Sequence, residues 1–436
     1  MQPHILFLNR TAHTLGGAAT WLDYIEPGLR NGGWRVSIGL LQGRQFHRPE
    51  RYLEQHPHQE WVRISCTTGT PEGRRDALRR AIQSIQPDLV ITLNVTDAVV
   101  VVGECRSAGL SMPRIAMSAQ MIDEGLLKDI ADWAHVLDAV ICTNELTRQL
   151  VITLGGMAPE RVCYGPYGVS ARQVAPPRHR ADRLSIFYVG RIDWPDKRVH
   201  DIPLILDALD ARSVPFELTV IGLGPDEAEF RRRIQPWIHN GSARLLGRLA
   251  PEDTWTHMHP GRDVLLLTSW TDTGPFVVYE AMARNVAVVS SRYYGSGLER
   301  ALRHEETGML FPIGDASAAA DCLMRLWASP ELYQRLVSHA SHMVRDRYAI
   351  DHSCAVWNRI FQSILHLPQP VGSPGNRQDH SLPEGFEFSD QRPLHVDSPP
   401  GDGDGSDEND EWPLTLARVS PGNPSFWDYV AKLDAR

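Results

Sequence analysis

Residues 264–291 read VLLLTSWTDTGPFVVYEAMARNVAVVSS, in which two short apolar runs enclose a helical pattern. The runs VLLLTS and VAVVSS have the length and the branched side chains of buried strands. Pro275 suits the first helical position, with Thr273 or Gly274 as the cap before it, and Asn285 tolerates the left-handed backbone just past a helix end. Strand, helix and strand in this order predict a parallel sheet covered by helices.

The same alternation of strands and helices fills most of the chain and pauses once. It begins with HILFLN, a glycine-bearing loop, a helical stretch and the strand RVSIGLL. Residues 173–183 hold two prolines among polar and charged residues, which predicts a linker. After it the pattern restarts at LSIFYVGR. We therefore expect two successive α/β domains, residues 1–172 and 184–350.

The composition changes again in the tail, residues 368–436, where Pro, Gly, Ser and Asp dominate. This tail has 13 acidic and five basic residues, and six of the acids lie in residues 402–411. Such a segment buries too little apolar area to offset its loss of conformational entropy, so we expect disorder. The final stretch, SFWDYVAKLDAR, is apolar enough to dock on the domains. Docking and an unstructured end are both left open for it.

The charge balance of the 436-residue chain excludes some classes of partner. The net charge is −9, but the tail supplies most of it, and the rest of the chain is nearly balanced. A balanced chain lacks the concentrated basic face that nucleic acid requires. The six cysteines have neither disulfide-like nor zinc-like spacing, and the first apolar run is too short for a signal peptide or a membrane span. We expect a soluble, cytoplasmic protein.

One stretch raises the question of membrane contact. Residues 74–85, RRDALRRAIQSI, combine four arginines with apolar residues at helical spacing. An interfacial helix has this pattern, and so does an amphipathic helix that packs on its own sheet. We favour the second interpretation and keep peripheral membrane contact as the alternative.

Two carboxylates surround the helix start in the opening stretch. Asp272 stands just before the helix and Glu280 about one and a half turns inside it. The N–H groups of this helix start would face the crevice beyond VLLLTS, where open parallel sheets bind ligands. Carboxylates placed there can accept bonds from the paired hydroxyls of a sugar nucleotide. Taken alone, Asp272 also fits a partner of the helix dipole, worth about 0.3–1 kcal/mol.

Two cations follow the strand LSIFYVG. Arg191 and Lys197 lie in the loop after it, at the carboxyl end of a predicted parallel strand. A planar guanidinium and a compact ammonium together suit a diphosphate. The chain has 41 arginines and only three lysines, so a lysine in this loop suggests that the shape of the cation matters. A solvated loop is the alternative for this pair alone.

These stretches together resemble the retaining glycosyltransferases of family 4. The resemblance covers residues 4 to about 366, and its most specific motifs are FYVGRIDWPDK, LTVIGLGPDEAEF, ARLLGRL, TDTGPFVVYEAMARNVAVVSS and GSGLERALRHEETGMLF. It implies an α/β protein of GT-B fold, with two facing Rossmann-like domains and a cleft for donor and acceptor between them. It also implies that a helix at about residues 351–366 packs back on the first domain.

The resemblance implies a role for each matching residue. Arg191 and Lys197 would bind the donor diphosphate and stabilise the leaving group, and Asp272 would contact the donor sugar as the third catalytic residue. The family has a glutamate where this chain has Asp272, whose side chain is one methylene shorter. Glu280 would bind the ribose. The other donor-binding residues implied are Gly16, Gly17, Gly274, Pro275 and Phe276.

The acceptor side departs from the family pattern. Gln120 stands where many members have a histidine near the reacting sugar, and an amide cannot take a proton. Tyr167 stands where the family often has an asparagine. Asp123 and His13 are further acceptor-side candidates, and ordinary loop residues are the alternative interpretation for both. The acceptor is therefore left as an unknown carbohydrate, lipid-linked molecule or small molecule.

The reaction that the resemblance implies needs neither cofactor nor metal ion. A nucleoside-diphosphate sugar would give its sugar to an acceptor hydroxyl with retention of anomeric configuration. Two alternatives stay open. One is a GT-B nucleotide-sugar hydrolase or epimerase, and the other is a catalytically silent GT-B partner protein.

Overall fold

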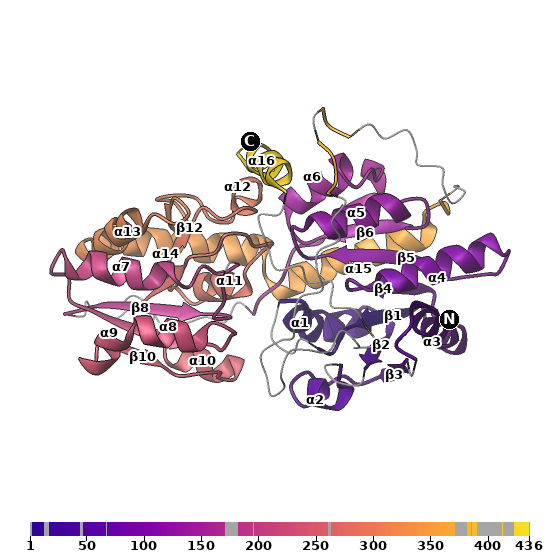
Figure 1. The fold of residues 1–436 in the computed structure, drawn as a ribbon, viewed down its shortest axis with the longest axis horizontal. Helices are drawn as coiled ribbons and strands as arrows, with labels where there is room; N and C mark the ends of the chain where they lie inside the picture. Colours follow the sequence, from indigo (N-terminus) through magenta and orange to yellow (C-terminus); the bar gives the residue numbers. More distant parts are fainter. Residues whose placement is uncertain are drawn as a thin grey trace. The chain divides into compact units, whose positions relative to one another are not determined.

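The computed structural model divides the chain into two compact units (Figure 1). Unit 1 comprises Met1–Gly168 and Asp351–Leu433, and unit 2 comprises Val169–Ile350 and Asp434–Arg436. Most of the predicted linker lies outside the described residues. The structure describes residues 2–12, 17–43, 47–66, 68–170, 182–194, 196–259, 263–370, 382–384, 386–389, 412 and 423–435.

Unit 1 is built on a parallel sheet of seven strands in the order β3-β2-β1-β4-β5-β6-β7. The central strands are almost entirely buried, because helices cover both faces of a parallel sheet. The strands are β1 (His4–Asn9), β2 (Arg35–Gln42), β3 (Trp61–Ser65), β4 (Leu89–Thr92), β5 (Arg114–Ala119), β6 (Ala139–Cys142) and β7 (Val162–Tyr164). The helices of this part of the chain are α1 (Gly17–Asn31), α2 (Pro49–Leu53), α3 (Pro71–Ile85), α4 (Thr96–Ser107), α5 (Glu124–Trp133), α6 (Glu145–Thr153), the 3-10 turn η1 (Pro159–Arg161), α15 (Ile350–His366) and α16 (Pro424–Asp434).

Helix α15 packs on unit 1, although it follows unit 2 in the sequence. The indole of Trp357 lies 4.7 Å from that of Trp21 in α1, measured between ring centroids. Phe361 makes edge contacts with Phe7 of β1 and with Trp34. All five rings are buried, and each such ring contributes about 1.5–3 kcal/mol relative to an exposed position.

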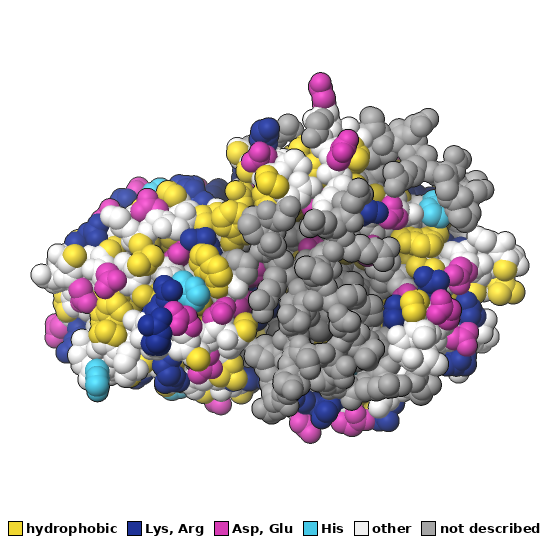
Figure 2. All heavy atoms as spheres, viewed as in Figure 1, with side chains coloured by type: hydrophobic (Ala, Val, Ile, Leu, Met, Phe, Trp, Pro, Cys, Tyr) yellow, Lys and Arg dark blue, Asp and Glu magenta, His cyan; other side chains and the backbone are white. Residues whose placement is uncertain are grey.

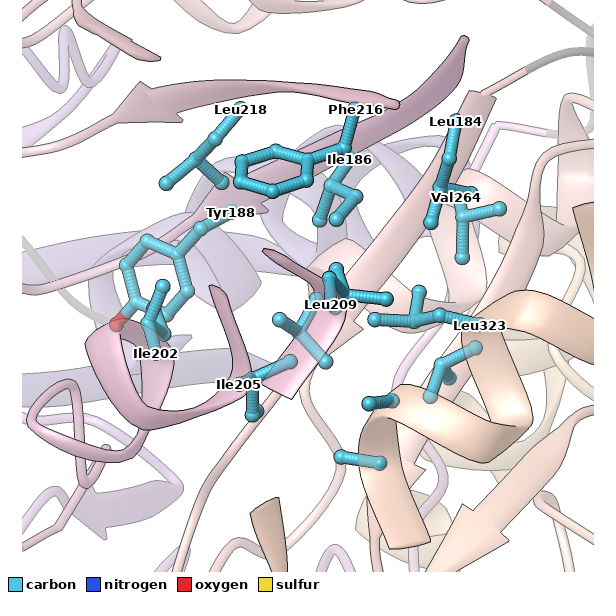
Figure 3. Packing of buried hydrophobic residues seen from close by; sticks show 14 of the residues in the cluster. Leu184, Ile186, Tyr188, Ile202, Ile205, Leu209, Phe216, Leu218, Val264 and Leu323 are labelled. Carbon is cyan, nitrogen blue, oxygen red and sulfur yellow. The ribbon is translucent and has the colours of Figure 1, made fainter. Parts of the chain in front are cut away.

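Unit 2 is built on a second parallel sheet, of six strands in the order β10-β9-β8-β11-β12-β13. Ile186 of β8, Leu209 of α7 and Leu323 of α13 converge in one buried cluster (Figure 3). The strands are β8 (Leu184–Val189), β9 (Phe216–Ile221), β10 (Ala243–Leu245), β11 (Asp263–Leu267), β12 (Ala287–Ser291) and β13 (Met309–Phe311). The helices are α7 (Asp201–Asp210), α8 (Glu227–Arg233), α9 (Gln235–His239), α10 (Pro251–Thr256), α11 (Phe276–Ala283), α12 (Ser296–Glu299), α13 (Ala316–Ala328) and α14 (Pro330–Arg347).

The order of strands reverses once in each sheet. In unit 2 the chain runs from β8 to β9 and β10 on one side, and then returns to β11 on the other side of β8. Open parallel sheets bind ligands outside the carboxyl ends of the strands at such a reversal. The loops after β8 and β11 therefore stand at the favoured place for a ligand.

The helix of the opening stretch starts one residue later than its sequence predicts. Pro275 occupies the N-cap with φ −66° and ψ 112°, so α11 begins at Phe276. Gly274 has φ 123° and delivers the chain to an extended proline, which is why the helix cannot begin there. The prediction for Asn285 is confirmed, because this residue has φ 59° after the helix end.

The described parts of the tail contain a helix. Residues 424–434 form α16, in which Phe426 and Val430 are buried, so the docking alternative applies to this stretch. The indole of Trp412 is also buried, and its N–H donates to the carbonyl of Gln42 at 2.8 Å. The acidic residues 402–411, for which disorder was expected, lie outside the described residues.

The arginine-rich stretch forms most of α3 and is held by carboxylates. Arg74 pairs with Asp97 of α4 at 2.6 Å, and Arg79 pairs with Glu104 of α4 at 3.1 Å. Leu78 of the same helix is fully buried. These contacts agree with an amphipathic helix packed within its own domain. Within the described residues, no helix has the length and the apolar character needed to cross a membrane.

Candidate functional site

Two hydrogen bonds to backbone carbonyls of the loop after β8 join it to the loop after β11. The N–H of Trp270 donates to the carbonyl of Asp196 at 2.8 Å, and the hydroxyl of Thr268 donates to the carbonyl of Lys197 at 2.7 Å. Each bond joins the backbone of the first loop to the second loop. The side chains that these two loops carry are therefore held in a fixed relation at the strand reversal.

Lys197 and Asp272 form an ion pair across these loops. The lysine Nζ lies 2.5 Å from the Asp272 Oδ2, and both side chains are mostly buried. Burial acts to lower the pKa of Lys197, but the adjacent Asp272 outweighs burial, so the pKa is raised above its ordinary value. The lysine is therefore charged at neutral pH, and the carboxylate fixes its direction.

Arg191 is held by two carboxylates of its own loop. Its Nε pairs with Asp193, and its Nη2 lies 2.7 Å from the Asp196 Oδ2. Burial would lower the pKa of Arg191, but Asp193 and Asp196 reverse the shift and raise it. The phenol of Tyr188 donates to the Arg191 carbonyl at 2.6 Å, and the Asp193 carboxylate accepts the Lys197 N–H at 3.0 Å. Two cations and three carboxylates thus form one connected cluster.

The loop after β12 forms backbone hydrogen bonds with the loop that carries Asp272, the partner of Lys197. The N–H of Asp272 donates to the carbonyl of Tyr294 at 3.1 Å, and the N–H of Tyr294 donates to the carbonyl of Trp270 at 2.9 Å. Helix α11 begins four residues after Asp272, and its N-cap makes no side-chain hydrogen bond. The positive end of the α11 dipole therefore adjoins the cluster and favours an anion there. Glu280 lies within α11 and is partly exposed.

Glycines bring the loop after β9 against the loop that carries the arginine. A Cβ on Gly222 would lie 1.9 Å from the carbonyl oxygen of Gly190, and a Cβ on Gly224 would lie 2.0 Å from that of Ile192. The N–H of Gly222 also donates to the carbonyl of Gly247 after β10, at 2.8 Å. These close approaches require glycine, and they give the Arg191 loop a rigid backbone support. The sequence does not reveal these close approaches at Gly222 and Gly224.

In unit 1, the two departures from the family pattern contact each other. The Tyr167 hydroxyl donates to the Gln120 Oε1 at 3.2 Å, and the Gln120 Nε2 donates to the Ser118 hydroxyl at 2.9 Å. Tyr167 is buried, whereas Gln120 is partly exposed at the end of β5. The structure therefore fixes the orientation of this amide through a tyrosine.

Asp123 has a structural contact. Its carboxylate accepts the N–H of Leu126 at 2.8 Å and so caps α5. Burial raises the pKa of Asp123 to about 6, and Asp129 adds to this rise. The neighbouring Glu124 accepts a hydrogen bond at 2.7 Å from the amide of Asn423, in the tail. Both loop acids thus have partners within unit 1.

The structure describes only some of the remaining candidate residues. Gly17 is the first residue of α1. His13 and Gly16 lie outside the described residues.

Among the residues that are described, no three His, Cys, Asp or Glu side chains gather as a metal ion would require. On the face of unit 2 that Figure 2 shows, acidic and basic side chains lie beside one another.

Comparison with solved structures identifies the fold. The Anabaena HepE structure in complex with UDP and glucose superposes with a TM-score of 0.66 at 18% identity, covering 83% of this chain and 100% of that one. Sucrose-phosphate synthase from Thermosynechococcus elongatus gives a TM-score of 0.67 at 17% identity, covering 84% and 99%. The fold is GT-B. Two parallel α/β domains of Rossmann type, as the sequence predicted, make up this GT-B protein.

Comparison of sequences finds a family model that matches most of the second GT-B domain. Residues 170–343 match the family model of glycosyl transferases group 1. The chain is 25% identical to an exopolysaccharide phosphotransferase of Streptomyces coelicolor over 313 residues, which cover 71% of this chain and 32% of the relative. It is 27% identical to a phosphatidyl-myo-inositol mannosyltransferase of Mycobacterium leprae over 253 residues, covering 56% and 62%. It is 34% identical to the amylovoran biosynthesis glycosyltransferase AmsK of Erwinia amylovora over 203 residues, covering 44% and 45%.

These matches leave part of each relative unmatched, because the chain spans about a third to three fifths of their length. The structure does bring Arg191, Lys197 and Asp272 of the GT-B donor-side prediction together in one cluster. Sequence reasoning missed Asp193 and Asp196 as partners of the arginine. The only available signal was the presence of two aspartates between the cations in RIDWPDK.

Proposed function

We propose that this protein is a glycosyltransferase that moves a sugar from a nucleoside-diphosphate sugar to an acceptor hydroxyl with retention of anomeric configuration. The observation that carries the proposal is the cluster of Arg191 and Lys197 at the strand reversal of unit 2, beside the N-terminus of α11. A planar guanidinium, a compact ammonium and the positive end of a helix dipole at one place suit a diphosphate.

In this proposal the two cations stabilise the leaving group. Negative charge grows on the diphosphate as the sugar bond breaks, and preorganised cations act most strongly where charge develops. Arg191 and Lys197 supply this positive charge, so the proposed reaction needs no metal ion. Asp272 accepts hydrogen bonds from hydroxyls of the sugar while it stays paired with Lys197. Glu280 accepts hydrogen bonds from hydroxyls of the ribose. These two roles stay predictions of the proposal.

Retention follows if the acceptor approaches the face that the diphosphate leaves. A departing phosphate oxygen then takes the acceptor proton, and no protein base is required. Gln120 is compatible with this route because its amide only needs to hydrogen-bond a hydroxyl. Two of the relatives support the activity, because one is a mannosyltransferase and the other is a glycosyltransferase of amylovoran biosynthesis. HepE was solved with UDP and glucose, which makes UDP-sugars the first donors to test.

The test is a panel of UDP-, GDP- and ADP-sugars, each examined for binding and for diphosphate release with and without candidate acceptors. The proposal predicts that one donor binds and that its diphosphate is released faster with an acceptor. Release that ignores every acceptor would favour a hydrolase or epimerase. No nucleotide binding at all would favour a silent partner protein. The same panel is run on Lys197→Ala, which removes one of the two cations. Lys128→Ala is its matched control, because Lys128 pairs with Asp132 on a surface helix.

A further inference from the structure

The cluster formed by the loops after β8 and β11 contains one more carboxylate than it contains cations. Arg191 and Lys197 are paired with Asp193, Asp196 and Asp272 in the structure. Each cation therefore already has an anionic partner before any ligand binds. A diphosphate must share these cations with the carboxylates or replace one of them.

The three carboxylates are not equally replaceable. Asp193 is 7% exposed and holds the loop twice, through the Arg191 Nε and the backbone N–H of Lys197. Asp272 holds the Lys197 ammonium. Asp196 contacts Arg191 through Oδ2 only, and its buried Oδ1 has no hydrogen-bond partner among the described residues. A buried carboxylate oxygen without a partner is unfavourable, so the Asp196 carboxylate is the least firmly held of the three.

We propose that Asp196 is a built-in competitor for the donor diphosphate, which holds Arg191 until a phosphate group replaces it and which takes up a proton as the phosphate binds. The proposal rests on the function proposed above and adds a residue that sets its affinity and its pH dependence. An ionised Asp196, whose side chain is 27% exposed, repels a phosphate beside it. A protonated Asp196 has an O–H that can donate to a phosphate oxygen.

The groups around Asp196 favour this proton uptake. Burial and the neighbouring Asp193 raise the pKa of Asp196, while Arg191 and Lys197 lower it, and the net shift is upward. Asp272, from the loop after β11, is engaged with Lys197. Burial raises the pKa of Tyr188, on β8, far above its ordinary value, so this phenol stays neutral. A phosphate that displaces Asp196 from Arg191 removes its stabilising cation and raises its pKa further.

The experiment is calorimetry of UDP binding to the full chain, with ADP and GDP as further probes. Each titration is run at several pH values, in two buffers of different ionisation enthalpy, so that the number of protons taken up is measured. The variants are Asp196→Asn and the control Asp321→Asn, whose carboxylate is 60% exposed and pairs with Arg212 on the surface. The difference in proton uptake between a variant and wild type does not contain the ionisation of UDP itself, because that contribution is the same in both titrations.

We expect Asp196→Asn to bind UDP roughly ten- to a hundredfold more tightly at pH 8, because the variant lacks the competing charge. Its affinity should change less with pH, and it should take up fewer protons than wild type. Asp321→Asn should match wild type in both quantities. Asp193→Asn should bind more weakly, because it loses the contacts that hold the loop.

Unchanged or weaker UDP binding by a folded Asp196→Asn variant overturns the inference. Equal proton uptake by this variant and wild type overturns it as well. Tightening by Asp193→Asn to the same degree would show a general charge effect rather than a special role of Asp196, and it also overturns the inference. A wild type that binds none of UDP, ADP and GDP contradicts the proposed function, and the inference falls with it.

Discussion

At the scale of single residues, the cluster in unit 2 depends on one pair that is distant in sequence and on two pairs within a single loop. Lys197 and Asp272 are 75 positions apart and form one ion pair. Residue type and position after a strand were enough to select both of them. The partners of Arg191 could not be selected in the same way, because the sequence RIDWPDK does not show that both aspartates turn back toward the arginine. The fold of the loop brings them there.

The shape of the lysine is the first property to test. Lys197→Arg keeps the charge but places a planar guanidinium where a compact ammonium contacts Asp272 at 2.5 Å. We expect turnover to fall by about tenfold, less than for removal of the charge. Steady-state transfer measures it, with Lys128→Arg as the control. Normal turnover in the Lys197→Arg variant would show that only the charge matters.

Glu280 tests the ribose contact. Glu280→Gln should weaken donor binding by about 1.5–3 kcal/mol, since the hydroxyls lose a charged acceptor. Calorimetry with the donor selected by the panel measures the change, and the variant Glu227→Gln, at a partly exposed position of α8, serves as the control. Equal affinities of wild type and a folded Glu280→Gln variant would remove the ribose assignment.

At the scale of elements, apolar runs predicted the strands well where burial is complete. HILFLN coincides with β1, because both faces of this strand are covered. The strand β3 was not predicted, and its burial explains why: four of its five residues are exposed or only partly buried. The edge position of β3 removes the apolar signal on which the prediction depends. The start of α11 was misplaced by one residue because the conformation of Gly274 could not be read from the sequence.

The contact between the loops after β8 and β9 gives a prediction at this scale. Gly222→Ala should lower the free energy of unfolding by about 1–3 kcal/mol through strain at φ 145°, with a further loss because a Cβ has no room beside Gly190. Gly241→Ala is the matched control, since Gly241 also has a positive φ but has no atom within 4 Å of an added Cβ. Chemical denaturation measures both variants. Equal losses would show that the close approach does not matter.

At the scale of the whole molecule, the two-domain division was visible because the strand and helix pattern stops and restarts. The docking of the chain end was only one of two alternatives, because a short apolar stretch does not reveal its partner. Asp434 is buried, and its carboxylate accepts the N–H groups of Gly295 at 2.8 Å and Leu298 at 3.0 Å. Residues 424–434 thus belong to the folded protein, although the composition of the surrounding tail predicts disorder.

The chain end therefore contributes to stability. Asp434→Ala removes the carboxylate that accepts the N–H groups of Gly295 and Leu298, and we expect a loss of about 1–3 kcal/mol in the free energy of unfolding. Asp428→Ala changes the same charge at an exposed position of α16 and should stay within about 0.5 kcal/mol of wild type. Thermal and urea melts compare the two variants. Equal stability of the two would mean that the Asp434 contacts contribute nothing.

The proposed function requires above all that both cations act on one diphosphate. The measurement is single-turnover sugar transfer by Arg191→Ala, Lys197→Ala and the double variant, with folding checked by melting and Lys128→Ala as the control. Each single variant should lose on the order of 10²–10³ in rate, as removal of a preorganised donor does. The double variant should lose less than the product of the single losses, because the two groups share one ligand. Near-normal rates in both folded single variants would contradict the claim.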